Sequence, residues 1–98
     1  MSLPLRLLPE AQAEYDAAAD WYEDRAAGLG VDFVARVGAV FRRAAANPKL
    51  HAKVYGEVRK AVVTRFPYVV LYQEEPDEVL VISVFHTSRD PADWQSRL

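Results

Sequence analysis

The sequence predicts an α+β fold in which a helical hairpin packs on a mainly antiparallel four-stranded sheet. Three observations lead to this prediction. Apolar residues recur at helical spacing through most of residues 9–46, a glycine pair interrupts that pattern once, and residues 58–85 consist of runs rich in β-branched and aromatic side chains. The expected order is strand, helix, helix, then three strands and a short C-terminal helix. With 98 residues and no linker or repeat, we expect residues 1–98 to form one domain.

The first half predicts an edge strand followed by the two helices. Residues 3–8 are an apolar run, and Pro4 within it favours an edge position or a strand start because proline cannot donate to a neighbouring strand. Pro9 suits the first position of a helix. One apolar face is predicted for each helix: Ala11, Tyr15, Ala18, Tyr22 and Ala26 in the first, and Val31, Val34, Val37, Phe41 and Ala44 or Ala45 in the second. Gly28-Leu29-Gly30 predicts the turn between them, and Asn47-Pro48 the end of the second helix.

The second half predicts the remaining strands, over residues 58–64, 68–73 and 79–85. In the last run, the residues that point to either face of the strand are apolar, so we expect this strand to be buried on both faces. Pro67 separates the first two runs, and the polar, proline-containing residues 74–78 predict a hairpin turn. A regular strand would place Arg59 and Arg65 on one face. Asp90 followed by Pro91 predicts the start of a short helix.

Composition limits the function classes. The net charge of −2 argues against tight, general binding to DNA or RNA. The absence of cysteine excludes disulfides and thiolate metal sites. Neither a signal peptide nor a membrane span is expected, so the default location is the cytoplasm. Charge is unevenly distributed: residues 9–24 carry acids and no Lys or Arg, whereas residues 42–65 carry most of the basic side chains.

Polar side chains gather at the ends of the last two predicted strands. Arg65, Tyr68, His86 and Arg89 are residue types that hold phosphates, stack on bases and move protons. Each also has a structural interpretation. The arginines have Asp90, Glu57 and the acidic first helix as ion-pair partners. Tyr68 suits core or rim packing, and His86 suits a hydrogen bond to a loop carbonyl. Both interpretations stay open on the sequence.

Taken together, the motifs resemble the RelE/ParE superfamily, the toxins of bacterial type II toxin–antitoxin pairs. The resemblance covers nearly the whole chain and is greatest to the ParE-like branch. It rests on segments that are individually unspecific but occur in the family's order and spacing: Trp21-Tyr22-Glu23, Gly28-Leu29-Gly30, Phe33, Asn47-Pro48, Val58-Arg59-Lys60, Arg65-Phe66-Pro67-Tyr68, Tyr72, His86, Arg89-Asp90-Pro91 and Trp94.

The resemblance implies one of two mechanisms. RelE-like toxins cut messenger RNA on the ribosome, and in that case Arg65, Tyr68, His86 and Arg89 would be the catalytic residues. ParE-like toxins bind DNA gyrase and are not nucleases. The lysines of the nuclease branch are sparse here, and Trp94 stands where those enzymes have a tyrosine, which has a titratable proton. The sequence therefore favours a gyrase-binding toxin over an enzyme. A third alternative is a non-toxic regulatory module that only binds its antitoxin.

The resemblance also implies a partner. The antitoxin of such a pair wraps a C-terminal segment around the toxin and supplies the contacts to operator DNA. Candidate partner-binding residues are Trp21, Arg59, Arg65, Arg89 and Trp94, and Val40 is grouped with Trp21 because both lie outside the periodic helix faces. Trp94 has a structural alternative, as a cover for the sheet. We expect an antitoxin carboxylate close to Arg65 or Arg89, and neither a cofactor nor a metal is implied.

Overall fold

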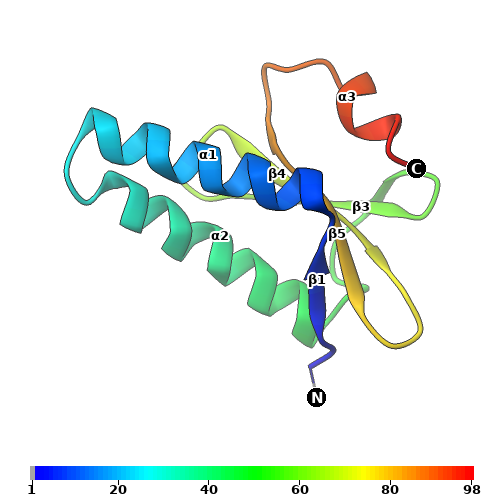
Figure 1. Ribbon diagram of the computed structural model, residues 1–98. Helices are drawn as coiled ribbons and strands as arrows, with labels where there is room; N and C mark the ends of the chain where they lie inside the picture. The colour runs from blue at the N-terminus through cyan, green and yellow to red at the C-terminus, as the bar shows by residue number, and fades with distance from the viewer. Residues whose placement is uncertain (1) are drawn as a thin grey trace.

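The computed structural model describes residues 2–98 as a helical hairpin on one face of a five-stranded sheet (Figure 1). The elements are β1 (Leu5–Leu7), α1 (Pro9–Arg25), α2 (Leu29–Ala46), β2 (Lys53–Tyr55), β3 (Val58–Val62), β4 (Tyr68–Glu74), β5 (Val79–His86) and α3 (Ala92–Gln95). The strand order is β1-β5-β4-β3-β2. Strand β1 pairs with β5 in parallel, and all other pairs are antiparallel.

The prediction of a four-stranded sheet is wrong, because the sheet contains a fifth strand, β2. Strand β2 pairs Lys53 with Arg59 and Tyr55 with Val58, at the edge opposite β1. All three of its residues are exposed, so it lacks the alternation between apolar and polar positions that marks a half-buried strand. The prediction that Pro4 marks an edge or a strand start is confirmed on both counts, because β1 begins directly after Pro4 and lies at an edge of the sheet. The backbone carbonyl of Pro4 accepts a hydrogen bond from the Val79 amide at 2.8 Å. This bond does not need a backbone N–H on proline, so Pro4 is tolerated here.

The turn between α1 and α2 depends on the glycines that predicted it. Gly28 has φ +87°, a conformation that favours glycine. The Glu23 carboxylate accepts from the Gly28 amide at 2.8 Å and from the Gly30 amide at 2.9 Å, so it satisfies two free donors at the start of α2. These bonds lower the pKa of Glu23, and the Gly28 amide contributes most. The two helices are thus joined closely at this end.

Apolar side chains form one cluster on each face of the sheet. The helix-side cluster joins α1 and α2 to the sheet, and its fully buried members include Phe33, Val37 and Tyr72. The second cluster lies on the other face, where α3 packs: Val58, Val69, Leu71, Ile82, Phe85 and Trp94. Strand β5 contributes to both clusters, so the expectation that it is buried on both faces is confirmed.

Positions after β3 and along α2 differ from expectation. Strand β3 ends at Val62, and Arg65 lies in the following loop with φ +74°, so strand parity does not place Arg65 with Arg59. Val40 is fully buried in the helix-side cluster, and its expected place on a partner surface is therefore wrong. Val31 and Val34, which belong to the apolar face predicted for α2, are 70% and 41% exposed. The buried face of α2 instead runs through Phe33, Val37 and Val40, so the prediction placed the start of this face wrongly.

Candidate functional site

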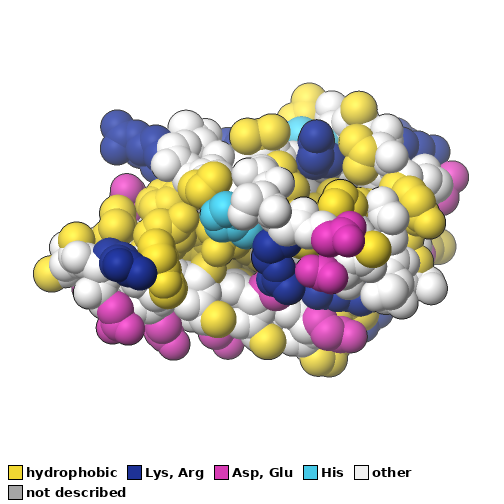
Figure 2. Space-filling model, turned by 90° about the horizontal axis from the view of Figure 1, so that it is seen from above, with side chains coloured by type: hydrophobic (Ala, Val, Ile, Leu, Met, Phe, Trp, Pro, Cys, Tyr) yellow, Lys and Arg dark blue, Asp and Glu magenta, His cyan; other side chains and the backbone are white. Residues whose placement is uncertain are grey.

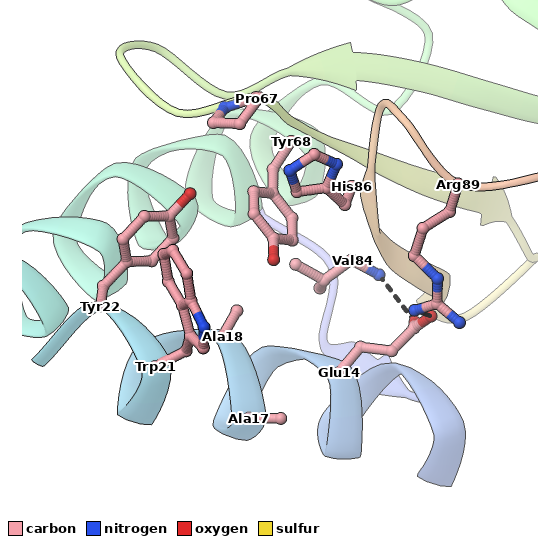
Figure 3. A pocket seen from close by; sticks show the side chains of 10 residues that line it. All are labelled: Glu14, Ala17, Ala18, Trp21, Tyr22, Pro67, Tyr68, Val84, His86 and Arg89. Atoms are coloured by element: carbon pink, nitrogen blue, oxygen red, sulfur yellow. Dashed lines mark hydrogen bonds and ion pairs between the residues drawn. The ribbon is translucent and has the colours of Figure 1, made fainter. Parts of the chain in front are cut away.

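A cleft of about 480 Å³ lies between α1 and the adjoining ends of β4 and β5 (Figure 3). It brings together four residues that the sequence singled out, from segments far apart in the chain. Its lining consists of Glu14, Ala17, Ala18, Trp21, Tyr22, Pro67, Tyr68, Val84, His86 and Arg89. In Figure 3, Trp21 and Tyr22 lie at one end and Arg89 with Glu14 at the other, while the Tyr68 hydroxyl points into the space between.

The aromatic end of the cleft combines a packed wall with an exposed ring. Tyr22 packs edge-on against Phe66, with ring centroids 4.8 Å apart, and against Trp21 at 5.1 Å. Trp21 is 52% exposed, and the Arg25 guanidinium lies 4.2 Å from its ring centroid. A large, half-exposed indole beside an arginine is a common centre of protein–protein binding energy.

Tyr68 and His86 form the middle of the cleft. They are paired across β4 and β5, and their rings meet edge-on with centroids 5.1 Å apart. Burial, reinforced by the neighbouring Tyr22, raises the pKa of the Tyr68 phenol. The phenol is therefore a hydrogen-bond donor at neutral pH and not a base.

His86 is held by its own loop. Its Nδ1 accepts from the Ser88 backbone amide at 3.1 Å and lies 2.8 Å from the Ser88 hydroxyl. Because the backbone amide can only donate, the neutral ring carries its proton on Nε2. The expected hydrogen bond from His86 to a loop carbonyl is not found, because the ring instead contacts the amide and hydroxyl of Ser88. Neutral His86, which lines the cleft, keeps a donor at Nε2.

The polar end of the cleft is a charge-balanced cluster around Glu14. The Glu14 carboxylate accepts two bonds from Arg97 at 2.9 Å, one from the Ser83 hydroxyl at 2.8 Å and one from the Val84 amide at 3.3 Å. Arg89 lies 3.6 Å from Glu14 and 3.3 Å from Asp93. Two arginines are thereby matched by two carboxylates, and the hydrogen bond with Glu14 raises the pKa of Arg97.

Glu14 was not among the candidate residues, although the sequence contains a signal for it. It falls between Ala11 and Ala18, on the buried face of α1, where a charged side chain needs a partner. The partner Arg97 is 83 residues away, and only the fold brings the two together. The expectation that an arginine pairs with the acidic first helix is met at Arg89.

The other candidate residues lie outside the cleft. Arg65 is exposed and takes part in none of the ion pairs found within residues 2–98. Arg59 donates to the His51 carbonyl at 2.6 Å, and burial together with Arg43 and Arg59 lowers the pKa of His51. Trp94 is 5% exposed and packs in the second apolar cluster.

The space-filling view agrees with a mixed surface rather than a basic one. On the face that Figure 2 presents, histidine atoms lie between hydrophobic side chains on one side and adjacent basic and acidic side chains on the other. Within residues 2–98 no three His, Asp or Glu side chains are placed to hold a metal ion. None of the helices in this range has the length and apolar character that a bilayer crossing requires.

Comparison with known proteins gives the family. Residues 5–91 match the family model described as the ParE toxin of the type II toxin–antitoxin system parDE. The chain belongs to the ParE toxin family. The resemblance inferred from its motifs, including the preference for the ParE-like branch, is therefore confirmed.

The fold agrees with this family. A solved structure described as a chromosomal ParDE toxin–antitoxin system from P. aeruginosa matches with a TM-score of 0.74. The match covers 89% of this chain and 98% of the other, at 16% sequence identity, a level at which the likeness concerns the fold. No curated protein sequence matches significantly.

Proposed function

We propose that this ParE-family chain is an active toxin that binds a target protein, DNA gyrase, and is neutralised by a cognate antitoxin. The family match supports the toxin assignment, and the likeness to a structure described as a ParDE toxin–antitoxin system supports an antitoxin partner. The cleft between α1 and the ends of β4 and β5 is the proposed target-binding site. Its exposed Trp21, with Arg25 stacked on the ring, is the proposed anchor.

One observation carries the preference for binding over RNA cleavage. Arg89, the only Lys or Arg among the residues that line the cleft, is already paired with Glu14 and Asp93. A nuclease needs free positive charge where the phosphate gains negative charge in the transition state. Because Glu14 and Asp93 balance the charges of Arg89 and Arg97, the cleft offers a phosphate no free positive charge.

The proton-transfer groups support the same preference. RNA cleavage requires a base that takes the proton of the 2′-hydroxyl. Nδ1 of His86 is occupied by the Ser88 amide, and burial keeps Tyr68 protonated. Arg65, the second arginine expected for catalysis, is not part of the cleft lining.

A ribosome-dependent endonuclease remains the second candidate, because Tyr68, His86 and Arg89 do line one cleft. Binding to the ribosome could rearrange these side chains. The third candidate is a non-toxic module that only binds its antitoxin. It is favoured because several residues that line the cleft already have hydrogen-bond or ion-pair partners within the chain.

Two assays separate these candidates. The purified chain is added to gyrase supercoiling and cleavage reactions and, separately, to a translating ribosome with primer extension on the message. We expect inhibited gyrase and intact message. Codon-spaced cuts in the message would overturn the proposal in favour of the nuclease, and no effect in either assay would favour the regulatory module.

A pair of variants tests the site. Trp21→Ala should raise the concentration needed to inhibit gyrase about tenfold or more, since truncating an interface anchor costs upwards of about 1–2 kcal/mol. The matched control is Tyr55→Ala, because Tyr55 is 47% exposed and lies outside the cleft. Equal inhibition by the two variants would exclude the cleft as the target site.

The proposal assigns operator DNA to the antitoxin. The toxin carries a net charge of −2, which does not favour a phosphate backbone. We expect a gel shift of the operator with the complex and none with the toxin alone. A shift by the toxin alone at physiological salt would contradict this part.

A further inference from the structure

A second hollow lies on the other face of the sheet from the helical hairpin. It has a volume of about 300 Å³, and α3 forms one wall of it. The strands β2 to β5 contribute Val54, Lys60, Val69, Leu71 and Phe85. Helix α3 and the loop between β5 and α3 contribute Thr87, Pro91, Trp94 and Gln95. We call this hollow the α3 groove.

Apolar side chains continue from the groove onto open surface. Val62 pairs with Val69 across β3 and β4, and Val69 pairs with Phe85 across β4 and β5. Along this row the exposed fraction falls from 64% at Val62 to 8% at Val69 and 4% at Phe85, because α3 covers only the β5 end. Val54 on the neighbouring edge strand is 47% exposed. An apolar row that runs from open surface into a hollow is typical of a binding surface.

The charge on the α3 groove specifies the chemistry of a partner. Lys60 is the only charged side chain among the lining residues. It is exposed, and no ion pair within residues 2–98 includes it, whereas nearby Lys53 is paired with Glu57 at 2.9 Å. A cation without a partner beside an apolar row favours a segment that carries both an apolar side chain and a carboxylate.

We propose that the α3 groove binds a segment of the antitoxin in which an apolar side chain packs on Val62 and Val69 and a neighbouring Asp or Glu pairs with Lys60. This inference rests on the proposed function, because it names the antitoxin as the partner. It places the neutralising contact on the sheet face opposite the helical hairpin, away from the cleft that contains Trp21. The two surfaces can therefore be altered separately.

The test uses the whole toxin and the product of the reading frame adjacent to its gene, purified after co-expression. The dissociation constant is measured by titration for wild type, Lys60→Glu and Val62→Asp. Each variant should weaken binding about tenfold or more, because Lys60→Glu opposes two negative charges and Val62→Asp places a carboxylate on the apolar row. Both positions are exposed, so both variants should fold, and thermal unfolding checks this.

Two further variants serve as controls. Arg42→Glu makes the same charge change on α2, outside the groove, and should leave the affinity within about twofold of wild type. Lys60→Met keeps the aliphatic stem and removes the charge, so its loss should be smaller than that of Lys60→Glu. In the gyrase assay without antitoxin, Lys60→Glu should inhibit as wild type does.

The outcomes separate this inference from the proposed function. Unchanged affinity in Lys60→Glu and Val62→Asp would overturn the α3 groove as the site, while gyrase inhibition by wild type would still support the toxin. A loss in Arg42→Glu equal to that in Lys60→Glu would show that net charge alone drives binding, and it would also overturn the inference. A wild-type chain that binds neither gyrase nor the adjacent gene product would contradict the proposed function itself.

Discussion

The two faces of the sheet differ in how completely they are covered. On one face, α1 and α2 bury an aromatic core in which Phe33 lies 5.0–6.2 Å, between ring centroids, from Tyr15, Tyr22, Phe66 and Tyr68. On the other, the four-residue α3 covers Phe85 and leaves Val62 mostly exposed. Packing therefore stabilises this chain mainly from the helical side of the sheet. The face with less packing retains exposed apolar surface at Val62.

The largest expected effect tests this difference in packing directly. Phe33→Ala should lower the free energy of unfolding by about 3–5 kcal/mol, because it removes a fully buried ring and leaves a cavity. Val62→Ala should change it by no more than about 0.5 kcal/mol, since that side chain is mostly exposed. Urea unfolding measures both, and similar losses at the two positions would remove the distinction between the faces.

The next effect concerns Glu14, which links the two faces. Glu14→Gln should cost about 2–3 kcal/mol, because it leaves Arg97, a side chain only 11% exposed, without its charged partner. Arg97 lies two residues beyond the end of α3, so hydrogen exchange should also accelerate at residues 92–97. Glu10→Gln, at an exposed position of the same helix, is the control. If exchange in α3 stays at the wild-type rate, Glu14 does not hold that helix.

Two glycines of α2 differ in how much space a side chain would have. A Cβ at Gly30 would lie 2.5 Å from the Ala19 carbonyl oxygen and 2.9 Å from the Glu23 Cβ, so Gly30→Ala should destabilise by about 1–3 kcal/mol. At Gly38 the nearest atom is the end of the Arg42 side chain at 3.4 Å, so Gly38→Ala should stabilise by up to about 1 kcal/mol through helix propensity. Thermal unfolding measures both signs. Stabilisation by both substitutions would show that α1 and α2 are not in close contact at Gly30.

The smallest expected effect depends on pH. The pKa of Glu23 is lowered in the folded chain, so its contribution to stability is present above its ordinary value of 4.5 and is lost as the pH falls through the lowered value. Glu23→Gln should therefore be less stable than wild type at neutral pH, and the two should converge in acid. Unfolding curves from pH 7 to 3 measure the difference, and a constant difference would exclude the carboxylate charge as its cause.

Most helices and strands could be predicted from the sequence, because residue spacing and turn residues are properties of neighbouring positions in the chain. The 3.6-residue spacing, Gly28 and Pro48 located both helices and their turn, and the β-branched runs located β3, β4 and β5. Strand β2 was missed because three exposed residues carry no periodicity, and its partner strand alone defines it. Val40 was misplaced because burial on a packed helix depends on two neighbours and not on one face.

The candidate site was likewise predicted only in part. Trp21, Tyr68, His86 and Arg89 were identified by residue type, and the structure places all four on one cleft. The sequence could not predict that Glu14 would neutralise this cleft, because Arg97 reaches Glu14 only after β5 and α3 have folded back onto α1.

Residue spacing and the succession of motifs were enough to predict the fold class, the order of the main elements and the family. The electrostatics of the cleft and the exposure of the second face follow from the folded arrangement. Charge balance and burial are properties of side chains that meet in space, and here the decisive pair, Glu14 and Arg97, is separated by nearly the whole chain.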